Sequence, residues 1–442
     1  MFYQEVTIDS KGVHPRGPVF LSYRHSDGTE LATDLAWALR SAGMPVWHDQ
    51  SDLPPGDTGR RLEEAMQSGL SGAVLLVTPD IEASDCIKSL ELPRLLVLRE
   101  QESFMLSIAS TIEKEAGRLD HRAPDRLLFS EPSGILKGMR QDSALTPEDL
   151  AAIAQNHCRQ RMEALREEIE SAGNVIDINV QTRFAPSSSD LRGDLIMRMR
   201  PPNPGDRRPN RKGLEEFQLS LRNLPYLLQT ARVKHARFRG GAHLSVAFAL
   251  GAALPTPLLQ HVDVVDKDGH KWGLSQSTPV PVTSTQLLEV RDCSSHEATT
   301  GDALVYVDLV PTPSDGAYER FLAAYPSRFV KVFHIRAAAG GILCPEDASV
   351  IVAEASNAIR RAAALSGTSE VHLLLRCPWT VALLLGRTLN TIRVHLYEWE
   401  TGPDAHANGG VPRYLPSMVV RSGAGGSPIE KVVLPTRCEA VA

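Results

Sequence analysis

A chain of 442 residues is about three times the length of a usual domain, so we expect two or three separate hydrophobic cores. Hydrophobic residues make up 42% of the sequence and charged residues 23%, which excludes a disordered or fibrous protein. The formal net charge of -6 excludes attraction of nucleic acid by the whole surface, so an anionic ligand needs a local basic cluster.

The six cysteines lie far apart, without CxxC pairs or the spacing of a metal site. This distribution fits a reducing cytoplasm and predicts no bound metal. No run approaches the ~18 apolar residues of a membrane-spanning helix, and the acidic N-terminus MFYQEVTIDSKG lacks the apolar core of a secretory signal. We expect a cytoplasmic protein that does not bind membranes.

Residues 17 to 100 alternate between short apolar runs and amphipathic, helix-like segments. The runs PVFLSY, MPVWHD and AVLLVTP have the length and composition of buried strands, and TELATDLAWALRSAG and GRRLEEAMQSGLSG separate them. Leu31, Leu35 and Leu39 share one face of the first helix, and Gly43 marks its end. This alternation predicts a parallel α/β sheet.

Three segments of this region, VFLSYRHSD, GMPVWHDQSDLPPGD and AVLLVTPDIEASDCIKSLEL, resemble the successive sequence boxes of a TIR (Toll/interleukin-1 receptor) domain. The resemblance implies a flavodoxin-like fold, which we assign to residues 1–145. It also implies one of two functions: an adaptor that only associates, or an enzyme that cleaves NAD+ at the nicotinamide glycosidic bond. The enzymes carry a glutamate in a W-x-x-x-E setting after the third strand. Here Glu91 matches that place, and Ile87 replaces the Trp.

Glu91 is the predicted catalytic residue. Loss of nicotinamide leaves an oxocarbenium-like ribose, and a fixed negative charge stabilises it more in the transition state than in the ground state. Nicotinamide is already a cationic leaving group, so a single carboxylate suffices where ordinary glycosidases use two. The alternative is a solvated glutamate on a helix surface.

Ligands of parallel α/β sheets gather outside the carboxyl ends of the strands, so the side chains after the first two strands are candidate NAD+ contacts. Alternatively, Tyr23 caps the core and Arg24 pairs with Asp49. We expect Trp47 in the core rather than at the ligand. The candidate NAD+ contacts are Tyr23, Arg24, His25, Asp49, Leu53 and Pro54.

One long helix is predicted within residues 146–174, with Thr146 as its N-cap and Pro147 in the first turn. We take it as the connection between two halves of the chain. A Pro-rich loop at residues 201–213 follows, and it has no aromatic side chain beside its charges. We therefore expect a solvated loop and no binding of a nucleic-acid polymer. Its basic residues are Arg207, Arg208, Arg211 and Lys212.

Residues 175–442 again mix short apolar runs with helical segments. The segments ARFRGGAHLSVAFALGAALP, FHIRAAAGGILCPEDASVIVAEASNAIRRAAA and EVHLLLRCPWTVALLLGRTLNTIRVHLYEWE resemble a SAVED domain, the sensor module of cyclic-oligonucleotide anti-phage systems. The resemblance implies two fused Rossmann-like (CARF-like) units with a cyclic oligoadenylate held between them. We expect cyclic tri-AMP.

Three predicted strands of this half end in Arg beside Gly, Pro or an aromatic side chain. Glycines let backbone N–H groups approach phosphate, arginines supply bidentate donors, and an indole stacks on a base. Alternatively, the glycines only make a turn, Arg376 pairs with a neighbouring acid, Trp379 anchors the core and Arg387 lies on an exposed helix end. The candidate messenger contacts are Arg239, Gly240, Gly241, His243, Arg336, Gly341, Arg376, Pro378, Trp379 and Arg387.

Together the two resemblances imply an anti-phage effector of the CBASS type. A cyclic oligoadenylate bound by the second half would drive assembly into an oligomer or filament and so activate NAD+ hydrolysis by the first half, which depletes NAD+. NAD+ is then a substrate, the messenger is an activator, and no cofactor is expected. The alternatives are a TIR scaffold without enzymatic activity and a cyclase that makes a cyclic ADP-ribose messenger.

Overall fold

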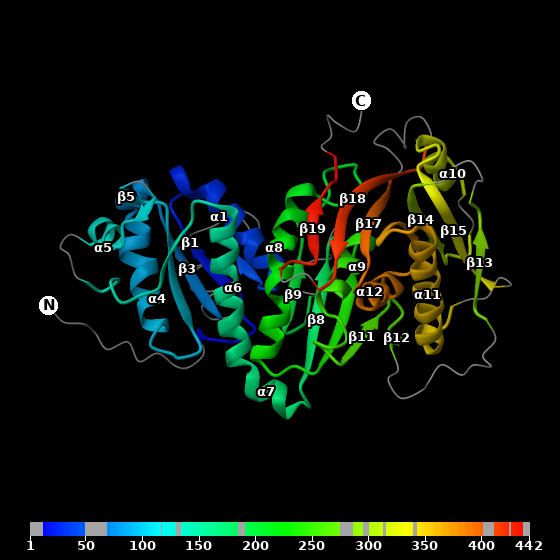
Figure 1. Ribbon diagram of the computed structural model, residues 1–442. Coiled ribbons are helices and arrows are strands. Elements are labelled where there is room, and N and C mark those ends of the chain that lie inside the picture. The colour runs from blue at the N-terminus through cyan, green and yellow to red at the C-terminus, as the bar shows by residue number, and fades with distance from the viewer. Residues whose placement is uncertain are drawn as a thin grey trace. The chain divides into compact units, whose positions relative to one another are not determined.

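The computed structural model describes most of the chain, and Figure 1 shows its helices and strands. The chain divides into two compact units, of which the first comprises Met1–Gly173, Asp194–Arg198 and Leu227–Arg232 and the second the remainder. The described residues are 12–48, 69–115, 117–129, 134–183, 191–274, 286–294, 300–312, 315–338, 343–400, 411–423 and 426–435.

The first unit is built on a parallel sheet with the strand order β2-β1-β3-β4-β7. Its central strand is GAVLLV, which is buried along its whole length, as expected for a strand that is covered on both faces. The predicted parallel α/β sheet is therefore confirmed. Its strands are β1 (Val19–Ser22), β2 (Val46–Trp47), β3 (Gly72–Val77), β4 (Met105–Ser110) and β7 (Gln141–Ser143).

Helices and short turns of helix connect these strands. Gly43 has a φ of 99° directly after α1, which confirms it as the end of that helix. The core contains Leu75, Ile87 and Leu95, and Trp47 packs against it as predicted. The remaining elements of the first unit are α1 (His25–Ser41), the 3-10 turn η2 (Pro79–Ala83), the π turn η3 (Ile87–Glu91), α4 (Leu92–Leu98), β5 (Glu113–Glu115), β6 (Arg118–Leu119), α5 (Ala123–Leu128), α6 (Pro147–Ala164), α7 (Arg166–Ser171) and β9 (Leu195–Arg198).

The segment predicted as one connecting helix forms two helices, because α6 ends at Ala164 and α7 begins at Arg166. Thr146 is the N-cap, as predicted, and its hydroxyl accepts from the backbone N–H of Asp149 at 3.1 Å. Helix α6 packs beside α1 within the first unit (Figure 1). The buried Arg161 ties it to the sheet, since its guanidinium donates to the carbonyl of Gly17 and to Ser71.

The second unit contains two α/β sheets. The strands that this unit contributes to the smaller sheet follow the order β12-β11-β10-β8, in which β8, β10 and β11 are parallel and β12 is antiparallel. Its strands are β8 (Val175–Gln181), β10 (His235–Gly241), β11 (His261–Val265) and β12 (Lys271–Gly273).

The larger sheet has seven strands in the order β13-β15-β14-β16-β17-β18-β19. Its four middle strands, β15, β14, β16 and β17, are parallel, and antiparallel strands flank them. The strands are β13 (Leu288–Asp292), β14 (Asp302–Asp308), β15 (Phe329–Ala337), β16 (Glu370–Arg376), β17 (Arg393–Glu400), β18 (Arg413–Arg421) and β19 (Ile429–Val432). The prediction that the second half contains two α/β parts is therefore confirmed, with one sheet in each part.

Two glycines allow the helices of this unit to cross at close range. A Cβ at Gly251 would lie 1.9 Å from the carbonyl oxygen of Leu383, and one at Gly386 would lie 2.0 Å from that of Phe248. Only glycine permits this backbone contact between α9 and α12. The helices are α8 (Arg211–Thr230), α9 (Leu244–Ala253), α10 (Asp315–Ala324), the 3-10 turn η6 (Pro345–Asp347), α11 (Ala348–Ser366) and α12 (Trp379–Thr388). Among the described residues, no helix combines the length and the apolar character needed to cross a membrane.

Candidate functional site

Glu91 lies at the carboxyl edge of the first sheet, beside the end of β1. Its carboxylate oxygen Oε2 accepts a hydrogen bond of 2.6 Å from the hydroxyl of Ser22, and Oε1 lies 3.7 Å from the thiol of Cys86. The side chain is only 7% exposed. Glu91 is therefore not the solvated helix residue of the alternative interpretation.

A π turn precedes helix α4 and sets the direction of Glu91. The backbone N–H of Leu92 bonds to the carbonyl of Ile87, five residues back, and this extra residue widens the turn. Ile87, which stands where the family's Trp is found, packs into the hydrophobic core. The turn thus places its first residue in the core and its last residue, Glu91, against the end of β1.

The residues after β1 gather at the same edge of the sheet. Tyr23 is buried, and its ring stacks on His25 at 5.2 Å and on His48 at 5.6 Å between ring centroids. Its hydroxyl also lies 3.3 Å from Nε2 of His48. Arg24 donates to the carbonyl of Ala83, which follows β3. The predicted NAD+ contacts Asp49, Leu53 and Pro54 lie outside the described residues.

An aspartate that the sequence analysis missed joins the two loops of this edge. Asp27, in the first turn of α1, accepts from the hydroxyl of Thr78 at 2.7 Å and from the backbone N–H of Asp80 at 2.9 Å. Ser26 in turn donates to Asp80 at 2.7 Å. These bonds hold the start of α1 against the end of β3, from which the chain leads to Glu91.

In the second unit, a buried aspartate holds two of the predicted arginines together. Asp308 ends β14, and the register of the sheet places it opposite Arg336 on β15 and Arg376 on β16. Arg376 donates to Asp308 at 2.7 Å, and Nε of Arg336 lies 3.6 Å from the other carboxylate oxygen. Arg376 thus pairs with an acid, as the alternative interpretation foresaw. Arg336 also donates to Asp315, which begins α10.

Two effects oppose each other at Asp308. Burial disfavours the charged carboxylate, but hydrogen bonds from His334 and Arg376 outweigh burial and hold the pKa of Asp308 below its ordinary value of 3.8. Ligand atoms of Asp308, Asp315 and His334 lie within 4.8 Å of one another, a spacing that suits a metal ion. The two arginines already contact these carboxylates, however, and the chain therefore supplies its own counter-charges.

Helix α12 starts beside this cluster, directly after β16. Pro378 is its N-cap, and the half-buried Trp379 is its first residue. Arg376, Pro378 and Trp379 thus follow one another at the carboxyl edge of the larger sheet. The predicted messenger contact Gly341 lies outside the described residues.

The predicted contacts at the end of β10 belong to the smaller sheet. Arg239 is 49% exposed and lies 3.6 Å from Asp177 on the neighbouring strand. Gly240 has a φ of 102°, and a Cβ there would lie 2.3 Å from the carbonyl of Val180, so the turn requires glycine. At Gly241 the surrounding space is open.

Two other predicted messenger contacts are engaged inside the second unit. His243 is fully buried, with Nδ1 at 2.8 Å from the hydroxyl of Thr182 and Nε2 at 2.9 Å from the carbonyl of Arg207. Burial lowers the pKa of His243 to about 3, so the ring is neutral. Arg387 is 3% exposed rather than on an exposed helix end, and donates to the carbonyls of Leu254 and Leu259.

Strand β17 contains a buried carboxylate that the sequence analysis did not single out. Glu398, on β17, accepts from both the backbone N–H and the hydroxyl of Ser245 at the start of α9. Burial raises the pKa of Glu398, although these hydrogen bonds oppose the shift. The carboxylate satisfies the N-terminus of α9 and ties that helix to the larger sheet.

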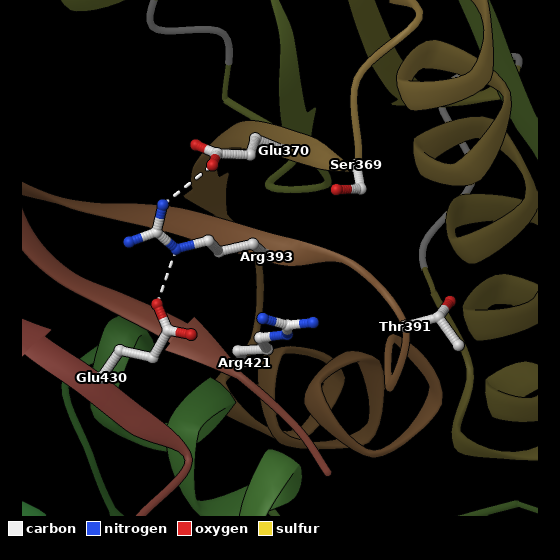
Figure 2. A pocket seen from close by; sticks show the side chains of 6 residues that line it. All are labelled: Ser369, Glu370, Thr391, Arg393, Arg421 and Glu430. Carbon is white, nitrogen blue, oxygen red and sulfur yellow. Dashed lines mark hydrogen bonds and ion pairs between the residues drawn. The ribbon is translucent and has the colours of Figure 1, made fainter. Parts of the chain in front are cut away.

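A polar cavity of about 360 Å³ opens at the opposite edge of the larger sheet, where β16 and β17 begin. Figure 2 shows Arg393 between two carboxylates, with bonds of 2.8 Å to Glu370 and 2.6 Å to Glu430. Arg376 ends β16, so the cavity is separate from the Asp308 cluster. Its lining residues are Ser369, Glu370, Thr391, Arg393, Arg421 and Glu430.

Two family models match parts of this chain. The profile of the family described as "SMODS-associated and fused to various effectors sensor domain" (SAVED) matches residues 194–418, about half of the chain. The profile of the TIR domain matches residues 19–108. The chain belongs to the SAVED family and carries a TIR domain. Both resemblances stated from the sequence are thereby confirmed.

One curated relative matches part of the TIR domain. The NAD(+) hydrolase PdTIR of Paracoccus denitrificans is 37% identical over 65 residues, which is 14% of this chain and 22% of that protein. The chain thus spans about a fifth of the length of this relative.

Solved structures of SAVED/CARF-domain containing receptors named Cap4 are also similar. The receptor of Acinetobacter baumannii with the cyclic trinucleotide 2'3'3'-cAAA is 13% identical, with 89% of this chain and 98% of that chain covered and a TM-score of 0.42. The receptor of Moraxella osloensis is 12% identical, with 90% and 100% covered and a TM-score of 0.40.

The family matches also sort the candidate residues of this TIR–SAVED protein. Ser22, Tyr23 and Glu91 fall within the TIR match, and the predicted messenger contacts, between residues 239 and 387, fall within the SAVED match. The carboxyl edge of the first sheet, with Glu91, therefore belongs to the TIR domain, and the Asp308 cluster belongs to the SAVED domain.

Proposed function

We propose that this TIR–SAVED protein is an NAD+ hydrolase that a cyclic oligoadenylate activates. The observation that carries the proposal is the Glu91 carboxylate, which is nearly buried at the carboxyl edge of the TIR sheet and accepts a 2.6 Å bond from Ser22. The sequence match to a protein named as an NAD(+) hydrolase supports the reaction class.

In this reaction the bond between ribose C1' and the nicotinamide nitrogen breaks, and its electron pair leaves with nicotinamide. The ribose becomes oxocarbenium-like, and the Glu91 carboxylate stabilises its positive charge. Water then adds at C1' and releases one proton, which gives ADP-ribose. Tyr23, Arg24 and His25 lie at the same edge and are the proposed contacts of the dinucleotide. NAD+ is the substrate, and neither a cofactor nor a metal takes part.

The proposed activator is cyclic tri-AMP, bound by the SAVED domain. Phosphates need cationic donors, and Arg336 and Arg376 stand together at the carboxyl edge of β15, β14 and β16. Trp379, three residues after the end of β16, supplies an indole for base stacking. We propose that messenger binding favours an assembled state, in an oligomer or filament, in which the TIR domain is active. Loss of cytoplasmic NAD+ during phage infection is the expected outcome.

The proposal is tested by nicotinamide release from the purified full-length protein. NAD+ is incubated with the protein and a panel of cyclic di-, tri- and tetranucleotides, with Glu91→Gln as the inactive control. We expect turnover with cyclic tri-AMP and a larger particle in light scattering. Absence of NAD+ loss with every activator would leave the adaptor function instead. If the product is cyclic ADP-ribose, the enzyme is a cyclase and not a hydrolase.

A further inference from the structure

The hydroxyl of Ser22 contacts the carboxylate of Glu91 and not a group of the sheet. Ser22 is the last residue of β1, is 1% exposed and pairs with Leu75 of β3 in the sheet. This pairing is made by backbone groups, so it does not use the hydroxyl. The hydroxyl instead donates at 2.6 Å to the carboxylate of Glu91, which lies 69 residues further along the chain.

The carboxylate of Glu91 is contacted at both oxygens from two different elements. Ser22 reaches Oε2 from the sheet, and the thiol of Cys86 lies 3.7 Å from Oε1 just before the π turn. An ionised carboxylate only accepts hydrogen bonds, so the hydroxyl must be the donor. A short bond from a neutral hydroxyl fixes the plane of the carboxylate without cancelling its charge.

We propose that Ser22 is a positioning residue for Glu91, which it holds in the orientation that faces the reacting ribose. This inference rests on the proposed NAD+ hydrolysis. The stabilisation of an oxocarbenium depends on a fixed charge at a fixed place, because a carboxylate that must reorient during the reaction loses part of its effect. A small displacement of a catalytic group reduces the rate more than it reduces substrate binding.

The test compares variants of the full-length protein with cyclic tri-AMP at saturation. For Ser22→Ala we expect kcat to fall at least about tenfold, with KM for NAD+ within about twofold of wild type. Ser22→Thr keeps the hydroxyl and should restore most of kcat. The messenger concentration for half-maximal activity should stay unchanged in both, because Ser22 is far in sequence from the sensor and acts only on Glu91.

A matched control breaks a similar bond elsewhere in the same sheet. Ser107 on β4 is 1% exposed, and its hydroxyl lies 2.8 Å from Nε2 of the buried His157. Ser107→Ala should lower the melting temperature but leave kcat within about twofold, since a merely structural loss does not touch Glu91.

A wild-type kcat in folded Ser22→Ala would overturn the positioning role while leaving the hydrolysis intact. If the wild-type protein releases no nicotinamide with any activator, the proposed reaction falls, and this role falls with it. If circular dichroism shows that Ser22→Ala does not fold, Ser22→Cys decides, because a thiol is nearly isosteric and a weaker donor. A reduced kcat in that variant supports the role, and an unchanged kcat overturns it.

Discussion

The substitution Asp308→Asn should weaken the fold of the sensor and strengthen its binding of the messenger. Asp308 is 4% exposed and ionised, and it neutralises part of the charge of Arg376 and Arg336. Asparagine keeps the size of the side chain and removes the charge. If these arginines bind phosphate, the carboxylate competes with the messenger, and its removal has opposite effects on stability and on affinity.

The loss of stability follows from the contact with Arg376, and the gain in affinity follows from Coulomb's law at a phosphate distance typical of an arginine that bridges the two groups. The 2.7 Å bond from Arg376 is charge-assisted, and its weakening costs about 1.5 to 3 kcal/mol. Part of this cost is recovered because a buried charge no longer has to be desolvated. For binding, a unit charge about 8 Å from a phosphate contributes about 2 kcal/mol at an effective dielectric constant of 20. Screening by salt halves this value, so affinity should rise about fivefold.

Affinity is measured by titration of fluorescent cyclic tri-AMP at two salt concentrations, and stability by urea unfolding. Asp302→Asn is the matched control, because Asp302 begins the same strand and pairs with His372 and Arg328 at the opposite edge of the sheet. It should destabilise the protein without tighter binding. Unchanged or weaker binding by Asp308→Asn, together with unchanged binding by Arg376→Ala, would refute the placement of the messenger at this cluster.

Three further predictions use the same preparations. Glu91→Gln should abolish nicotinamide release and leave the affinity for cyclic tri-AMP unchanged; more than about a tenth of wild-type activity, a loss below ~1.4 kcal/mol, would contradict the catalytic role. Arg376→Ala and Trp379→Ala should each raise the half-maximal messenger concentration at least about tenfold and reach the same maximal rate at saturation; a lowered maximum would contradict this. Because the pKa of His243 is lowered to about 3, the unfolded chain takes up a proton below the ordinary value of 6.5 while the folded protein does not. Stability should therefore fall as pH decreases from 6.5 toward 3, and urea unfolding of His243→Gln should show a weaker pH dependence.

Features that depend on local pattern were predictable from the sequence. The alternation of strands and helices predicted the parallel sheet, and the family resemblance singled out Glu91. The bond from Ser22 could not be foreseen, because it joins residues 69 positions apart and depends on the register of β1 and β3. The π turn at Ile87 was equally hidden, since one extra residue in a helical turn leaves no periodic signal.

The predicted messenger contacts show where reasoning from residue type fails. His243 was chosen because it follows a predicted strand together with Arg239 and two glycines, and Arg387 because an arginine beside glycine suits phosphate. In the structure both are buried and donate to or accept from groups inside the unit. Burial depends on the crossing of α9 and α12, which no short segment encodes. Arg336 and Arg376 lie on either side of Asp308 because parallel strands end at a shared edge.

The carboxylates of Glu91 and Asp308 illustrate how the partners of a buried acid decide its use. Both lie at the carboxyl ends of parallel strands and are less than a tenth exposed. The hydroxyl and the thiol beside Glu91 orient its charge without neutralising it, which suits stabilisation of a cationic ribose. Arg376 and Arg336 compensate the charge of Asp308, and the carboxylate keeps the two guanidinium groups close together in the absence of a ligand. If the messenger binds at that edge, it must compete with Asp308. A ligand with several phosphates then has an advantage over one with a single charge, because only the former makes enough contacts to displace the carboxylate from two arginines.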